Sequence, residues 1–173
     1  MNELISKLLG SIRVFKFWQI VMPNECAVRT LCGKRPKPLY SGMHFCVPLV
    51  GRIDVDQAVE QVFDIRAQSL TTSDGVCTLV GVSVSYEIVD PVRAQLRILD
   101  RDASLESETL RVVGAFVSGN SFDRCADSEW MLSEVVKELR KVATVRWGLK
   151  IHRVGLTDFA RHRVLRVLGA GNV

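Results

Sequence analysis

The residues of this sequence that could carry chemistry are few, and the first candidates are two carboxylates, Asp54 and Asp56. They stand two residues apart in a segment with strand-like alternation, so both side chains are expected on one face of a strand. Paired carboxylates can perform acid–base or metal chemistry, but they also occur on any solvated strand face. Since no histidine or third carboxylate accompanies them in sequence, an enzyme that uses this pair is kept only as a third hypothesis.

Metal-binding and nucleophile motifs are missing from the sequence. No CxxC, HExxH, GxSxG or P-loop pattern occurs, and no cysteine stands at a zinc-ligand spacing from a histidine. His44, beside Phe45, is interpreted as structural. The cysteines are interpreted as small thiols in a reducing compartment: Cys26, Cys32, Cys46, Cys77 and Cys125. The sequence therefore predicts a non-catalytic protein without a cofactor or metal.

Charge is segregated along the chain. Residues 1–37 carry seven Lys and Arg against two acidic residues, for +5, and residues 38–139 carry eight against sixteen, for −8. Residues 140–173 carry eight basic residues against one acidic, for +7, and the whole chain has a net charge of +4. An acidic body with two basic ends can contact an anionic surface through those ends, or pack one copy's end against another copy's body.

Three arginines near the end of the sequence are predicted to be electrostatic assembly contacts: Arg161, Arg163 and Arg166. They could also contact phosphates, since phosphate binding demands little besides positive charge. The small overall excess and the lack of a recognisable nucleic-acid-binding fold argue against nucleic acid as a partner. The expected partner is a second copy of the chain, with an anionic membrane surface or other subunits of a larger particle as further possibilities.

The first residues have the pattern of a short amphipathic helix over 4–15, followed at once by aromatic residues. At 100° per residue its apolar side chains share one face. No run of about 18 apolar residues occurs anywhere, so an interfacial helix is favoured over a membrane span. The predicted membrane or partner contacts are Leu4, Ile5, Leu8, Leu9, Ile12, Phe15 and Trp18. The alternatives are that this stripe packs on a neighbouring subunit or on the protein's own core.

The rest of the sequence predicts an α+β fold. Residues 20–90 alternate like strands between turn signals, with the clearest strand at 76–86 after an Asp74–Gly75 turn. Helices are predicted from Pro91 to about 100, from a Ser104 cap to about 116, and from an Asp127 cap to about 147. A strand at 149–156 and a short basic helix at 158–168 follow. The expected divisions are 1–19, 20–90, 91–157 and 158–173, and the fold-defining turn residues are Pro23, Gly42, Pro48, Asp74, Gly75, Pro91 and Gly148.

Six short motifs occur in order between about residues 20 and 158. They are VMPNECAV at 21–28 with Gly33, SGMHFCVP at 41–48, QSLTTSDGV at 68–76, YEIVDP at 86–91, LR at 110–111, and WGLKI at 147–151. Together they resemble the SPFH, or band 7, domain of stomatins, prohibitins and flotillins. Ser41 stands where that family usually has proline. No heptad repeat follows Phe159, so the resemblance implies a minimal form without the long coiled-coil arm of many relatives.

The resemblance implies self-association and a preference for membranes, and the amphipathic stripe and the charge segregation agree with it. The leading hypothesis is a non-catalytic scaffold that assembles laterally, as a ring, and lies peripherally on the cytoplasmic side of a membrane. The alternative is a structural subunit of a large soluble particle, in which the same stripe packs on neighbouring subunits.

Overall fold

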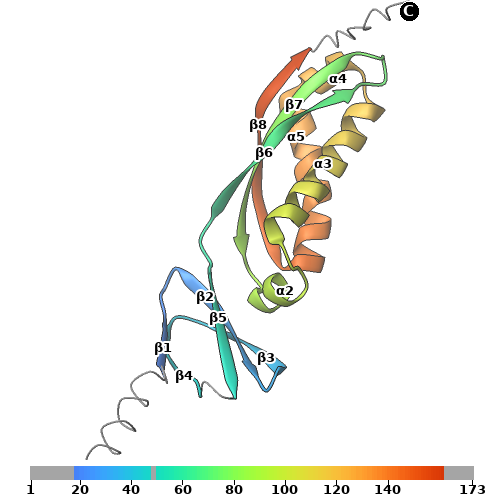
Figure 1. Ribbon diagram of the computed structural model, residues 1–173. Helices are drawn as coiled ribbons and strands as arrows, with labels where there is room; N and C mark the ends of the chain where they lie inside the picture. Colours follow the sequence, from blue (N-terminus) through green and yellow to red (C-terminus); the bar gives the residue numbers. More distant parts are fainter. Residues whose placement is uncertain (1–17, 48–49, 162–173) are drawn as a thin grey trace, which may run out of the picture. The chain divides into compact units, whose positions relative to one another are not determined.

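The computed structural model describes residues 18–47 and 50–161 (Figure 1). They form two compact units, and each unit is assembled from separate stretches of sequence. Among the described residues, unit 1 comprises 18–47, 50–60, 87–99 and 145–150, and unit 2 comprises 61–86, 100–144 and 151–161. The division differs from the one expected from the sequence, in which each part is a single continuous stretch.

Unit 1 is built from two small antiparallel sheets. One pairs β1 (Trp18–Val21) with β4 (Gly42–Phe45), and the other has the order β3 (Lys34–Leu39), β2 (Glu25–Leu31), β5 (Gly51–Gln57). Alternation within the strands sends one side chain in two to the interior. The buried cluster is Val21, Ala27 and Leu39, with Ile53 packed against it. The outward positions of β1 and β4 therefore do not contribute to this core.

A short helix completes unit 1. Helix α2 (Pro91–Leu96) begins with the proline in its first turn, and the Asp90 carboxylate accepts the Arg93 N–H at 3.1 Å. Proline suits this place because its missing N–H would have no partner there anyway. The Gly148 carbonyl accepts the N–H groups of Val89 and Asp90, each at 3.0 Å. Gly148 itself has φ +67°.

Unit 2 contains a three-stranded sheet in the order β6 (Gln61–Thr71), β7 (Cys77–Ile88), β8 (Leu149–Arg161). The outer ends of β7 and β8 belong to unit 1. Strand β7 is central, and its even-numbered side chains are all buried on one face: Thr78, Val80, Val82, Val84, Tyr86 and Ile88. This is the apolar face predicted from the alternation in the sequence. The turn before it holds Gly75 at φ +78°.

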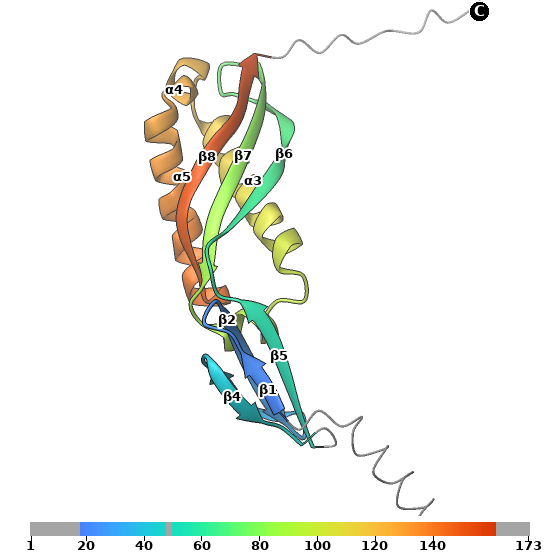
Figure 2. The same cartoon turned by 90° about the vertical axis from the view of Figure 1, so that its left-hand side faces the viewer.

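Helices α3 (Arg101–Gly119) and α5 (Ser128–Val142) lie side by side on one face of this sheet, as Figures 1 and 2 show. The short helix α4 (Phe122–Ala126) connects them, and a turn of π-helix, η1 (Ala143–Trp147), follows α5. Both long helices contribute fully buried side chains, among them Leu105, Val113, Met131 and Leu139. Asp127 caps α5 as the sequence predicts, accepting the Trp130 N–H at 3.3 Å.

The predicted α+β fold class, with strands first and then helices and a closing strand, is confirmed. Two local predictions are wrong. Ser104 does not cap α3, because Asp100 lies closer to the helix start and accepts the Ala103 N–H at 3.0 Å; the Ser104 hydroxyl donates to the Asp100 carbonyl instead. Residues 158–161 are not helical, because β8 continues to Arg161, where Phe159 stacks on Phe122 of α4.

Candidate functional site

The outward face of the β1–β4 pair is apolar and open to water. Trp18 lies opposite Phe45 and Ile20 lies opposite Met43 in the antiparallel register. Directly opposed residues share a face, and these four side chains are 57%, 50%, 58% and 66% exposed, respectively. The Trp18 and Phe45 rings pack edge to face with centroids 5.2 Å apart. We call these four residues the β1–β4 apolar face.

One end of this face adjoins the tip of the β2–β3 hairpin. A Cβ placed on Gly51 would meet Sγ of Cys46 at 3.1 Å and Cδ2 of Leu31 at 3.2 Å, so the end of β4 lies beside the end of β2. The Cys32 N–H donates to the Val50 carbonyl at 2.6 Å and holds the tip against the start of β5. The exposed side chains of Leu31 and Val50 therefore extend the apolar surface beyond the Trp18–Phe45 pair.

The hairpin also brings positive charge to this end of unit 1. Lys34, Arg35 and Lys37 are all exposed on β3, and Lys34 pairs in register with Leu31. Glu25, the acidic residue of β2, lies at the other end of the hairpin strand, where its carboxylate accepts the Met22 N–H at 2.9 Å. Exposed aromatic and aliphatic side chains beside a cluster of Lys and Arg are suited to the interface between water and an anionic bilayer.

The structure places two of the residues predicted to make contacts. Trp18 begins β1 on the apolar face, and Arg161 ends β8 in unit 2 with its guanidinium 5.0 Å from the centre of the Phe122 ring. The other predicted contacts lie outside the described residues: Leu4, Ile5, Leu8, Leu9, Ile12, Phe15, Arg163 and Arg166. Trp18 stands three residues after the last residue of the predicted amphipathic segment, Phe15.

The predicted turn residues lie at element boundaries where the structure describes them. Pro23 lies in the turn between β1 and β2, and Gly42 begins β4 with φ +139°. Pro48 lies outside the described residues. Asp74 and Gly75 form the β6–β7 turn, where the Asp74 carboxylate accepts the Thr72 hydroxyl and, at 3.1 Å, the Phe122 N–H. These two hydrogen bonds, in that order of importance, lower the pKa of Asp74.

The carboxylate pair has the geometry of a solvated strand face. Asp54 and Asp56 lie on the same side of β5, and Asp54 forms an exposed ion pair with Arg52 at 2.6 Å. The His44 Nε2–H donates to the Tyr40 carbonyl at 2.7 Å, in keeping with a structural role. Within residues 18–47 and 50–161, no cluster of three or more His, Cys, Asp or Glu side chains could hold a metal ion.

The hydroxyl of the buried Tyr86 has several hydrogen-bond partners in unit 2. It donates to Asp102 at 3.2 Å or Gln61 at 3.3 Å, and Arg101 donates to it at 3.3 Å. Burial raises the pKa of Tyr86, so its hydroxyl stays protonated at neutral pH. Burial also raises the pKa of the Cys125 thiol, which makes it a poor nucleophile. Both groups are features of a packed interior.

No helix among the described residues has the length and apolar character needed to cross a bilayer. The comparison with protein families then identifies the fold: the model of the SPFH domain / Band 7 family matches residues 19–164. The chain belongs to the SPFH/band 7 family. The resemblance found in the six sequence motifs is thereby confirmed.

Relatives of this SPFH domain are distant in sequence. An uncharacterized protein of Methanothermobacter thermautotrophicus is 27% identical over 152 residues, covering 88% of this chain and 48% of the relative. A stomatin homolog of Pyrococcus horikoshii is 25% identical over 81% of this chain and 53% of its own length. A putative band 7 family protein of a mimivirus is 22% identical over 73% of this chain and 42% of its own. The chain thus spans about half the length of the curated relatives it matches.

Three residues of the apolar face were not identified from the sequence: Ile20, Met43 and Phe45. Their signal was present as period-two alternation, with Met43, Phe45 and Val47 apolar and exposed around the half-buried His44 and Cys46. Alternation predicts which residues share a face, but it does not say which face is buried. The motif at 41–48 predicts a turn and a strand, but it carries no information about which side of that strand faces outward.

Proposed function

We propose that this SPFH domain is a non-catalytic scaffold that lies peripherally on an anionic membrane surface and assembles there side by side with other copies. The observation that carries the membrane part is the β1–β4 apolar face, with four large apolar side chains at least half exposed beside Lys34 and Arg35. Membership of the family and its stomatin-like relatives support the same function.

The amphipathic segment and the apolar face act together in this proposal. Residues 4–15 have apolar side chains along one helical face in the sequence, and only Lys16 and Phe17 separate them from β1. Apolar area removed from water contributes about 25 cal/mol per Å², and basic flanks add attraction to anionic lipids. Two adjoining apolar surfaces therefore give a stronger hold on a bilayer than either alone.

Flotation with vesicles containing anionic lipid tests the membrane part. The Leu8→Asp, Leu9→Asp double variant is expected to lose binding, because two charges on the apolar stripe cost several kcal/mol, more than the basic flanks recover. The matched control is Ser6→Asp with Gly10→Asp, which places the same charges on the polar side of the stripe. Unchanged binding by the Leu8, Leu9 variant would overturn the membrane part, and the stripe would then be assigned to a neighbouring subunit.

The assembly part rests on charge. The two ends of the sequence total +12 and the middle −8, so an end of one copy is attracted to the body of the next. Contacts between two different surfaces close only as rings or continue as filaments, whereas a two-fold contact stops at a dimer. We favour a ring, and light scattering across salt and protein concentration is its test. A monomer under every condition would overturn the assembly part.

A further inference from the structure

Unit 2 holds a groove between its two long helices. Helix α3 contributes Arg111, Val112, Ala115 and Phe116 to one wall, and α5 contributes Trp130, Glu134, Val135 and Glu138 to the other. Its volume is about 420 Å³, within the range of sites that bind a ligand or a few side chains. The Phe116 and Trp130 rings pack at one end with centroids 5.0 Å apart.

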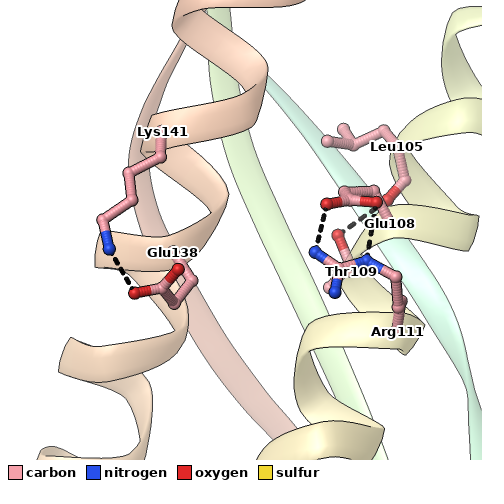
Figure 3. Close-up of polar contacts among 6 residues, drawn as sticks. All are labelled: Leu105, Glu108, Thr109, Arg111, Glu138 and Lys141. Carbon is pink, nitrogen blue, oxygen red and sulfur yellow. Dashed lines mark hydrogen bonds and ion pairs between the residues drawn. The ribbon is translucent and has the colours of Figure 1, made fainter.

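Charged side chains frame the groove. Arg111 binds Glu108 on its own helix through two hydrogen bonds of 2.6 and 3.0 Å, and Glu138 binds Lys141 at 2.5 Å (Figure 3). Glu134 pairs more loosely with Lys137, at 3.5 Å. The stretch from Asp100 to Val142, which forms both walls, contains nine acidic and six basic residues. The groove thus combines an apolar floor with surroundings of net negative charge.

The aromatic end already accepts a guanidinium. Arg124 of α4 lies 4.4 Å from the centre of the Trp130 ring, close enough for a cation–π interaction. An occupant that suits the apolar lining of the groove and the Glu134 and Glu138 carboxylates would carry aliphatic side chains interleaved with basic ones.

Residues 162–168 have that composition. Their sequence is HRVLRVL, with aliphatic Val164, Leu165, Val167 and Leu168 alternating in pairs with Arg163 and Arg166, and no acidic residue follows Asp158. We propose that the α3–α5 groove of one copy binds residues 162–168 of a neighbouring copy. This contact rests on the proposed function, which brings the basic end of one copy to the acidic body of the next. The groove is then the place on that body where the basic end binds.

Photo-cross-linking tests the contact directly. Ala115, an exposed groove residue, is replaced by the photoreactive benzoylphenylalanine, and the matched control carries the same group in place of the exposed Ala103 on the same helix, outside the groove. Isotopically light and heavy chains are mixed at high salt, returned to low salt and irradiated. We expect cross-links from position 115 to peptides containing 162–168, with light–heavy pairs among them, and none from position 103.

Each other result overturns the inference. Cross-links to 162–168 within single chains only would mean that the segment binds its own copy, and cross-links to residues 1–17 would give the groove a different occupant. Cross-links elsewhere in an assembly that light scattering shows to be intact would refute this contact but leave the proposed scaffold standing. A chain that stays monomeric throughout would refute the proposed scaffold itself.

A charge exchange provides an independent test. Glu134→Lys with Glu138→Lys is expected to weaken assembly at least about tenfold, and adding Arg163→Glu with Arg166→Glu to the same chain is expected to restore it, since the attraction is re-formed with opposite signs. Ala115→Trp, which fills the groove, should weaken assembly similarly, whereas Ala103→Trp should not. Equal effects of these two tryptophan variants, or no rescue by the exchange, would contradict the contact.

Discussion

Trp18 and Phe45 face each other across β1 and β4, with ring centroids 5.2 Å apart and ring planes inclined at 68°. Such an edge-to-face pair is worth about 0.5–1.5 kcal/mol beyond the area it buries, so the two rings hold each other in place. Both nevertheless remain at least half exposed. A rigid aromatic pair that is open to water is prepared to enter an interface without further ordering of its side chains.

Replacing this pair should weaken membrane binding. Trp18→Glu with Phe45→Glu is expected to lower affinity for anionic vesicles roughly 30- to 150-fold, because about 1–1.5 kcal/mol is lost for each half-exposed ring that no longer enters the bilayer. The matched control is Val89→Glu with Leu96→Glu, which charges two other exposed apolar residues of unit 1. Equal losses in both variants would mean that added negative charge alone weakens binding, and that the apolar face is not the contact.

The β6–β7 turn provides a test of the fold. Gly75 has φ +78°, and a Cβ at that position would meet nothing within 4 Å, so any cost of substitution comes from the backbone alone. Gly75→Val is expected to lower the free energy of unfolding by about 1–3 kcal/mol, because β-branched residues are strained in this region. Gly119→Val, at an ordinary φ with open space, is the control and should change little. Denaturant unfolding measures both.

Gly148 should be still harder to replace. It combines φ +67° with crowding, since a Cβ there would lie 2.7 Å from both the carbonyl oxygen and the Cβ of Asp90. Gly148→Ala is expected to cost more than about 2 kcal/mol, as strain and steric overlap add. Gly114→Ala provides the contrast, because its nearest neighbour would be Leu70 at 3.9 Å and alanine is the better helix former. Destabilisation of equal size in both variants would show that the crowding at Gly148 is relieved by small shifts.

The lowered pKa of the Asp74 carboxylate should make the free energy of unfolding depend on pH. Hydrogen bonds from the Thr72 hydroxyl and the Phe122 N–H lower its pKa in the folded state. A lowered pKa means that this stabilisation is present above the unfolded value of about 3.9 and is lost as the pH falls through the folded pKa. Asp74→Asn should therefore be less stable than the wild type at neutral pH, and the two unfolding midpoints should converge in acid. A difference between the two unfolding midpoints that stays constant with pH would contradict this account.

Much of the fold followed from local patterns. The alternation of β7 predicted its buried face, and Asp127 and Pro91 predicted two helix starts, because each signal involves residues within one turn or strand. Two predictions failed where local signals competed. Ser104 and Asp100 are both good caps, and α3 begins at the earlier one, where the Asp100 carboxylate accepts the Ala103 N–H. The residues after Leu156 have helical spacing, but pairing within the sheet and the stacking of Phe159 on Phe122 keep 158–161 extended.

The candidate sites needed the three-dimensional arrangement. Trp18 was identified from the sequence, but Met43 and Phe45 join it only because β4 returns antiparallel to β1. Phe116 and Trp130 are 14 positions apart in sequence, and they meet because α4 turns the chain so that α3 and α5 pack together. Charge segregation, in contrast, is a property of the sequence itself, so the argument from charge about assembly does not depend on the three-dimensional arrangement.

That charge argument leads to a prediction for the assembly. Reversing Arg161, Arg163 and Arg166 to Glu removes the positive charge that the acidic body attracts, so light scattering should show the assembly dissociating. The matched control reverses three exposed basic residues of the middle segment, Arg66, Arg97 and Lys137, and changes the net charge by the same amount. If location matters, the control should assemble at least as well as the wild type, because it makes the body more acidic.

Salt should act on the wild type in the same direction as the arginine reversal. Near about 1 M salt the Debye length shrinks to about 3 Å, and attraction between separated charges on two copies is largely screened. Apolar contacts respond in the opposite way, since they persist or strengthen in many salts. Dissociation by salt together with dissociation by the Arg161, Arg163, Arg166 reversal therefore identifies an electrostatic interface. An assembly that survives both changes is held by apolar surfaces, and the basic end of the chain then has no part in it.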